Sequence, residues 1–163
     1  MRVAKRAAMS VAVTVALAFA FALSTAVGAA PPPPNFSGNW TADLKASSFG
    51  PIGSPDHLTM QVTHKDPEIS IHYDLGMAGT PVIYEATCKI DGKECKATKG
   101  EVTLSLQWQG DTLILNRAMS YGGMAIKLKE SWTLSADGKT LTSSRDVSTD
   151  QGAASQKVVF TKS

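Results

Sequence analysis

Four two-residue turn signals constrain this chain more than any other feature of its sequence. From residue 36 onward, apolar and polar residues alternate in short runs, with the period of two that is typical of strands with one buried face. The runs are separated by pairs that favour tight hairpins: Asp91-Gly92, Lys99-Gly100, Gly110-Asp111 and Asp137-Gly138. Each pair, placed at the centre of a hairpin, sets apolar residues opposite one another. Because a slip by one residue would turn every side chain to the other face, this agreement predicts the register.

The predicted cross-strand partners follow from these turns. They are Cys88 with Cys95, Ala86 with Ala97, Ala97 with Val102, Cys95 with Leu104, Trp108 with Leu113, Leu106 with Leu115, Leu134 with Leu141, Trp132 with Ser143, and Glu130 with Arg145. Arg117 falls opposite Leu104 in the same register. The apolar face is therefore expected to include three charged side chains: Arg117, Glu130 and Arg145.

The fold class follows from the number of strands. Counting from Trp40 to Phe160 gives about ten antiparallel strands in an up-and-down meander, and a short turn near residues 44–48 is the one candidate for a helix. A long sheet of this kind tends to curl and close, because closure removes exposed edges. We therefore expect an all-β barrel. An open sheet or a two-layer sandwich is the alternative.

The N-terminal residues predict export. Arg2, Lys5 and Arg6 precede a nearly continuous apolar stretch over residues 7–23, and small residues follow it, which is the order of a signal peptide. We expect residues 1–29 to be removed by signal peptidase after Ala29, or alternatively after Gly28. An uncleaved membrane anchor is the competing interpretation, since the apolar stretch is long enough to span a bilayer.

The remaining chain is predicted to hold a Pro-rich tether over residues 30–35 and one barrel domain over residues 36–163. The leader carries three of the 16 Lys and Arg residues, so 13 remain against 14 Asp and Glu. A nearly neutral protein gives no support for nucleic-acid binding. We expect a periplasmic or extracellular location, with no stable membrane span after cleavage.

A family resemblance rests on two segments. The run Ser37-Gly38-Asn39-Trp40 resembles the Gly-x-Trp that opens lipocalins and related calycin barrels, in which the tryptophan plugs one end. The wider pattern is similar to a lipocalin-like group of small exported bacterial proteins without an established activity. That pattern comprises residues 35–40, Lys45, Ser47, Phe49, Gly50 and residues 132–141. The resemblance implies a calycin barrel, structural roles for Gly38 and Trp40, and Arg145 as the candidate for the arginine that lipocalins place over this tryptophan. It implies no catalytic residue.

Residues suited to chemistry are few. His64 falls on the inner face and His72 on the outer face, so a shared metal site is not expected, and the spacings typical of zinc ligands and of activated nucleophiles are missing. We expect no cofactor, no metal and no catalytic residue. Burying a charge costs several kcal/mol unless it is paired. The Glu130 and Arg145 pair therefore either fixes the register or, together with Arg117, receives an acidic head group.

The two cysteines predict a disulfide. Exported proteins retain disulfides, and a hydrogen-bonded antiparallel pair places its Cα atoms about 5.5 Å apart, within the range a disulfide permits. Cys88 and Cys95 are therefore expected to bond. The alternatives are an intermolecular bond or two free thiols packed in the core.

Together these features predict a non-enzymatic exported barrel that binds a small apolar or amphipathic ligand in its interior. The candidate ligand-binding residues are Tyr84, Trp108, Arg117, Glu130 and Arg145, with Leu104, Leu106, Ile126 and Leu128 as further apolar lining. One alternative is a structural or partner-binding envelope protein without a cavity. The other is a small-molecule enzyme that uses Glu130 or His64 as general base.

Overall fold

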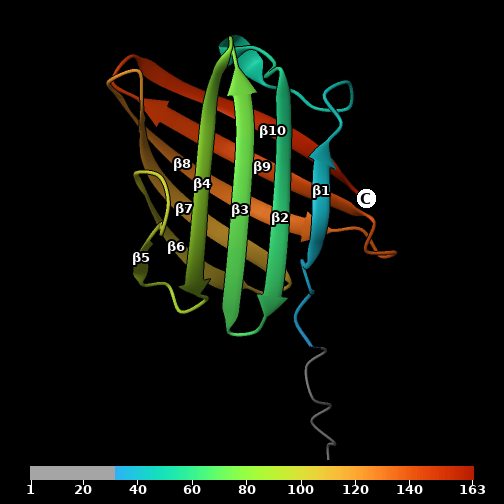
Figure 1. Cartoon of the computed structure of the whole chain (residues 1–163). Coiled ribbons are helices and arrows are strands. Elements are labelled where there is room, and N and C mark those ends of the chain that lie inside the picture. The colour runs from blue at the N-terminus through green and yellow to red at the C-terminus, as the bar shows by residue number, and fades with distance from the viewer. Residues whose placement is uncertain (1–31) are drawn as a thin grey trace, which may run out of the picture. The chain divides into compact units, whose positions relative to one another are not determined.

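The computed structural model describes residues 32–163, which form one ten-stranded antiparallel sheet. Neighbouring strands follow the order β4-β3-β2-β1-β10-β9-β8-β7-β6-β5, so the first and last strands of the chain pair with each other (Figure 1). The strands are β1 Gly38–Ala42, β2 His57–Lys65, β3 Glu68–Met77, β4 Thr80–Lys89, β5 Glu94–Lys96, β6 Val102–Gln109, β7 Thr112–Tyr121, β8 Met124–Leu134, β9 Thr140–Thr149 and β10 Gly152–Lys162. The predicted all-β meander is confirmed.

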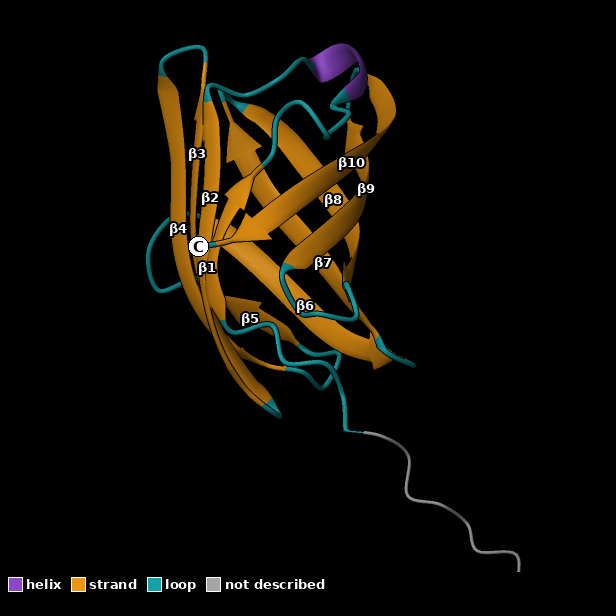
Figure 2. Cartoon of the chain, turned by 90° about the vertical axis from the view of Figure 1, so that its right-hand side faces the viewer, coloured by secondary structure: helices purple, strands orange, loops and turns teal. Residues whose placement is uncertain are grey.

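The sheet curls into a nearly closed barrel (Figure 2). Its two edges, β4 and β5, meet at a seam where no continuous ladder forms. One isolated bridge joins Glu85 to Lys99 across this seam. The apolar residues of alternating positions fill the interior, as the period-two pattern requires.

Three of the four predicted turns give the expected register. Trp108 pairs with Leu113 across Gly110-Asp111, and Glu130 pairs with Arg145 across Asp137-Gly138. Both turn glycines have positive φ, 59° at Gly110 and 68° at Gly138, which side chains with a Cβ rarely adopt. Cys95 likewise pairs with Leu104, in agreement with the Lys99-Gly100 turn.

The ladder predicted across Asp91-Gly92 is wrong. Ala86 does not pair with Ala97. Instead Glu85 bridges to Lys99, one residue out of the predicted register. The backbone N–H of Gly92 donates to the carbonyl of Leu106 at 2.7 Å, so this turn is held by β6 rather than closing a regular hairpin.

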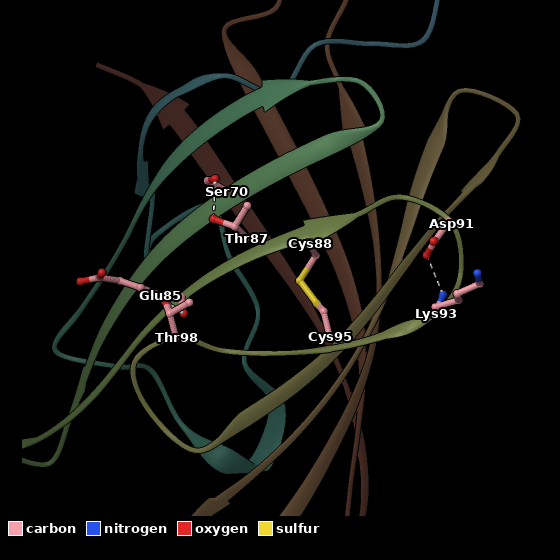
Figure 3. The surroundings of a disulfide bond; sticks show 8 residues. All are labelled: Ser70, Glu85, Thr87, Cys88, Asp91, Lys93, Cys95 and Thr98. Atoms are coloured by element: carbon pink, nitrogen blue, oxygen red, sulfur yellow. Dashed lines mark hydrogen bonds between the residues drawn. A yellow bond between two sulfur atoms is a disulfide. The ribbon is translucent and has the colours of Figure 1, made fainter.

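The predicted disulfide between Cys88 and Cys95 is confirmed. The two Cα atoms lie 5.8 Å apart, and the bond joins β4 directly to β5 (Figure 3). It therefore supplies a covalent link across a seam that has few backbone hydrogen bonds.

Residues 44–48, the predicted candidate for a helix, form a turn rather than a helix. In this segment the side chain of Asp43 accepts hydrogen bonds from the N–H groups of Lys45 and Ala46, which closes a turn rather than a helix. The one helix within residues 32–163 is the short 3-10 helix η1, Gly50–Ile52, which has Pro51 in its first turn. No helix among the described residues is long and apolar enough to span a membrane.

One end of the barrel is plugged by aromatic side chains. Trp40 is 1 % exposed, and its Nε1 donates to the carbonyl of Phe36 at 2.9 Å. The suggestion that Arg145 covers Trp40 is wrong, because Lys162 lies there, with its Nζ 5.4 Å from the ring centroid. Gly38 makes this approach possible, since a Cβ at residue 38 would lie 2.4 Å from Cε of Lys162.

The predicted signal peptide and the beginning of the predicted tether lie outside the described residues. Residues 32–37 form no regular secondary structure before β1 begins. Asn35 nevertheless contacts the barrel, since its Nδ2 donates to the carbonyl of His64 at 3.4 Å.

Candidate functional site

Three charged side chains lie inside the barrel on three consecutive strands. Arg117 is on β7, Glu130 on β8 and Arg145 on β9, and all three are at most 5 % exposed. Glu130 pairs directly with Arg145 and lies diagonally from Arg117, whose own partner is Leu128. Since diagonal and direct cross-strand neighbours on one face are within reach of long side chains, the register itself assembles the cluster.

Both oxygens of the Glu130 carboxylate accept hydrogen bonds. Its Oε1 accepts from Nη2 of Arg117. Its Oε2 accepts from Nε1 of Trp132 at 3.2 Å and from Oγ of Ser143 at 3.0 Å, and it also lies 3.1 Å from Nε of Arg145. Both oxygens of Glu130 therefore serve to hold neighbouring side chains in place.

Arg117 is held on several sides. Its Nη1 donates to the hydroxyl of Tyr84 at 3.1 Å, and its guanidinium carbon lies 4.6 Å from the ring centroid of Tyr73. The two tyrosine rings stack on each other, with centroids 5.0 Å apart. A guanidinium over aromatic faces gains cation–π stabilisation when it is desolvated.

Arg145 is less completely satisfied. Its Nε donates to Oγ of Ser143 at 3.1 Å, and its guanidinium carbon lies 5.9 Å from the ring centroid of Phe160. Its Nη2 is buried and has no hydrogen-bond partner among the described residues. A buried donor left without a partner costs about 1–3 kcal/mol. Nε of Arg117 is a second buried donor without a partner among the described residues, so each guanidinium group has one atom at which an added acceptor would be favourable.

The cluster has one carboxylate for two guanidinium groups. Burial by itself raises the pKa of Glu130, but Arg117 and Arg145 outweigh burial and hold that pKa at about 2. Burial also raises the pKa of Tyr84 to about 12, so its hydroxyl stays neutral. The net charge of the buried group is therefore positive at neutral pH.

An apolar cavity of about 100 Å³ lies beside this cluster, at the end of the barrel that carries η1; we call it the apolar chamber. Arg117 and Arg145 are its only charged lining residues within the described chain. The rest of its lining is apolar or neutral: Phe49, Ile52, Pro55, Leu58, Tyr73, Leu75, Met77, Val82, Met119, Tyr121, Ile126, Leu128, Val147 and Gln156. The segment before β2 closes over it, with Nε2 of Gln156 donating to the carbonyl of Phe49 at 3.1 Å.

The candidate residues from the sequence are only partly brought together. Arg117 and Arg145 line the chamber, as do Ile126 and Leu128. Glu130 contacts both arginines but is not a lining residue of the chamber. Tyr84 contacts Arg117 without lining the chamber. Trp108, Leu104 and Leu106 also lie outside the chamber lining.

Trp108 belongs to the plugged end. Its ring stacks on Phe36 with centroids 6.0 Å apart, and its Nε1 donates to Oδ1 of Asp66 at 2.9 Å. Sequence reasoning missed most of the lining residues, among them Tyr73 and Phe49. Strand parity was a sufficient signal for Tyr73, which shares an inner face with Leu75, but nothing in the local sequence indicated that Phe49 folds over the chamber.

His64 is buried at the plugged end, away from the chamber lining. Its Nδ1 accepts the backbone N–H of Phe36 at 3.2 Å, so the neutral ring carries its proton on Nε2. Burial lowers the pKa of His64, and Asp66, with Oδ1 3.8 Å from Nε2, offsets this only in part. His64 therefore anchors the segment that supplies Phe36.

The fold and the interior site define a small calycin-type barrel whose interior cavity is lined by two arginines. No family model matches the chain, and no curated protein matches it in sequence. Among solved structures it is similar to the fatty acid transporter REP1-NXSQ, with a TM-score of 0.52 and 11 % identity over 78 % of this chain and 96 % of that chain. It is also similar to secretory abundant heat soluble protein 4 from Ramazzottius varieornatus, with a TM-score of 0.50 and 14 % identity over 82 % and 99 % of the two chains.

A third similar structure is human cRBP IV, with a TM-score of 0.49 and 13 % identity over 80 % of this chain and 100 % of that chain. At these identities the likeness establishes the fold alone, which is lipocalin-like and calycin-type as the sequence predicted.

Proposed function

We propose that this protein binds a small amphipathic anion, with its acidic group at Arg145 and its apolar part in the apolar chamber. The observation that carries the proposal is that Arg145 lines the apolar chamber and has a buried Nη2 without a hydrogen-bond partner among the described residues. A carboxylate oxygen placed there accepts this hydrogen bond and balances the excess positive charge of the cluster. A fatty acid transporter among the structures of similar fold agrees with this role.

The contacts of Glu130 give the two arginines different roles in the proposal. Its carboxylate accepts from Arg117 and lies beside Nε of Arg145, which leaves Nη2 of Arg145 without a partner among the described residues. Arg117 already donates from both terminal nitrogens, to Tyr84 and to Glu130, and its Nε is its one donor without a partner among the described residues. We therefore assign the direct contact with the ligand to Arg145 and an electrostatic contribution to Arg117.

The same geometry argues against the enzymatic alternative. A general base near neutral pH needs a pKa close to the working pH, whereas the pKa of Glu130 is held at about 2 and both its oxygens already accept hydrogen bonds. His64 is buried, with its Nδ1 bonded to the backbone of Phe36. Neither residue has a substrate-facing basic atom.

Export is part of the proposal. The disulfide between Cys88 and Cys95 is of the kind that persists in oxidising compartments, which agrees with a leader over residues 1–29 and a periplasmic or extracellular location. The mature N-terminus is expected at Ala30, and intact-mass measurement of protein recovered from its own host tests this. Native mass spectrometry of the same material shows a retained ligand as added mass.

The binding test is a calorimetric titration of octanoate and of octanol into the wild-type protein and an Arg145→Gln variant. Because a hydrogen bond to a charged group contributes about 1.5–3 kcal/mol, the variant is expected to bind octanoate about ten- to a hundredfold more weakly and octanol equally well. Lys127→Gln is the matched control, since it removes one positive charge from the exposed face of β8. An octanoate affinity that is equal in all three proteins would reject the proposal.

A further inference from the structure

The apolar chamber is small for a complete ligand. Pockets that enclose a drug-sized ligand measure about 300–1,000 Å³, and the chamber measures about 100 Å³. A ligand with more than a short chain must therefore extend beyond it. The question is where its far end leaves the barrel.

A second hollow meets the chamber from outside. It is a groove of about 290 Å³ at the seam, where the start of β4 faces the end of β7; we call it the seam groove. Val82, Met119 and Tyr121 line both the chamber and the groove, so the two are separated only by these side chains. Ile83 also lines the groove and is 38 % exposed, one of two large apolar side chains in the described chain that are this exposed.

Hydrogen bonds close the barrel wall above and below this stretch, in which side chains alone separate the chamber from the groove. Above it, the hydroxyl of Tyr121 donates to the carbonyl of Met77 at 3.2 Å, joining the end of β7 to the end of β3. Below it, the N–H of Glu85 donates to the carbonyl of Lys99 at 3.1 Å, and the N–H of Thr98 donates to the carbonyl of Glu85 at 2.7 Å. The gap between these bonds has no ladder across it.

The closed part of the seam ends at Ile83, where the chain at residue 100 packs against β4. A Cβ at Gly100 would lie 2.8 Å from the carbonyl oxygen of Ile83, so the chain at residue 100 rests directly against β4. In an antiparallel strand, alternate residues direct their N–H and C=O groups to the same side. Since Glu85 directs its groups across the seam, Ile83 does too, so its carbonyl lies against residue 100 and its N–H is directed to the groove side.

We infer that the far end of the bound ligand leaves the chamber through the wall between β4 and β7 and lies in the seam groove. The groove combines apolar side chains with strand-edge backbone and with two polar lining residues, Glu101 and Ser120, and it is open to solvent. The inferred ligand class is thus an elongated amphiphile that tolerates a polar or charged group at the end remote from its acidic head. This inference rests on the proposed function, because it takes the head group to be at Arg145.

The test compares dodecanoate with dodecanedioate, which carries a second carboxylate at its far end. If the far end is solvated in the groove, wild-type protein binds the two with affinities within about fivefold. If the far end is enclosed, burial of the second carboxylate costs several kcal/mol, and dodecanedioate binds about a hundredfold more weakly or worse. The latter result would overturn the inference.

Two lysine variants locate the exit. Ile83→Lys places a cation at the groove and is expected to strengthen dodecanedioate binding about 1.5- to 5-fold at low salt, with no change for dodecanoate. Thr87→Lys is the matched control, because Thr87 is exposed on the same face of β4 as Ile83 and lines neither the chamber nor the seam groove. Equal strengthening by both variants would indicate a general charge effect and would overturn the inference.

Failure of the proposed function is distinguishable from failure of this inference. If dodecanoate binds the wild type and the Arg145→Gln variant equally, or binds neither, the head-group assignment fails and the inference fails with it. If Arg145→Gln weakens dodecanoate binding while Ile83→Lys leaves dodecanedioate binding unchanged, only the route through the seam is rejected.

Discussion

Nε of Arg145 lies 3.1 Å from Oε2 of Glu130, and the two residues are direct cross-strand partners on β9 and β8. This contact is one of several by which Glu130 holds two guanidinium groups inside a barrel of apolar side chains. The buried cluster is stable only because each charge has a partner or a hydrogen bond close by. Its arrangement leads to the first two predictions.

Glu130→Gln is expected to lower the free energy of unfolding by about 3–5 kcal/mol, because it leaves two buried guanidinium groups without a counter-charge. Urea unfolding followed by tryptophan fluorescence measures the change. Glu94→Gln, on exposed β5, is the matched control and should lie within about 0.5 kcal/mol of wild type. A loss for Glu130→Gln as small as that of the control would mean that the charges are solvated.

The stability of the protein should fall at acid pH partly through Glu130. Its pKa is about 2 in the folded protein, below the ordinary value of 4.5, so the unfolded chain binds this proton more readily. The stabilisation is therefore fully present above about pH 4.5 and is lost as the pH falls toward 2. Unfolding free energies measured from pH 6 to pH 2.5 should fall more steeply for wild type than for Glu130→Gln, and parallel profiles would contradict this assignment.

His64 should add a second pH dependence at higher pH. Because burial lowers its pKa, the folded state favours the neutral ring, which accepts the N–H of Phe36. This contribution is fully present above about pH 6.5 and is lost as the pH falls through the lowered pKa. His64→Asn retains an acceptor that does not titrate, so the change in stability between pH 8 and pH 5 should be smaller in this variant than in wild type.

Trp40→Ala is expected to cost about 3–5 kcal/mol, as truncations of large buried aromatics do. The ring is buried, donates to the carbonyl of Phe36 and is covered by Lys162. Lys162→Met keeps the aliphatic cover and should cost less than about 1 kcal/mol, since it removes mainly a cation–π contact. Thermal or urea unfolding measures both, and a cost below about 1 kcal/mol for Trp40→Ala would show that the plug does not depend on this residue.

Removal of the disulfide should destabilise the protein by about 2–3 kcal/mol, since the closed loop between Cys88 and Cys95 is short. Unfolding of the Cys88→Ala/Cys95→Ala variant, compared with wild type under non-reducing conditions, gives this value. Mass spectrometry after alkylation without reduction provides the direct check. Two alkylated cysteines in protein from the oxidising compartment would contradict the bond.

The sequence by itself determined the strands, most of their register and the inward direction of Arg117, Glu130 and Arg145. These features depend on contacts between neighbouring strands, and short turns such as Asp137-Gly138 set those contacts locally. The alternation of apolar and polar residues then decides which face is buried. The disulfide also followed from a local turn, although the ladder around it did not.

Tertiary structure alone decided how the sheet closes and what the closure encloses. At the seam Glu85 pairs with Lys99, whereas the Asp91-Gly92 turn predicts a partner one residue earlier in the chain. The register differs because the N–H of Gly92 donates to the carbonyl of Leu106, so the turn does not close a regular hairpin. Closure brings Tyr73 against Arg117 and sets Phe49 over the chamber, although these residues are far apart in the sequence. Lys162 rather than Arg145 covers Trp40, since the pairing of β1 with β10 brings the end of the chain back to its first strand. Contacts of this kind depend on the curvature of the whole sheet, for which no short stretch of sequence carries a signal.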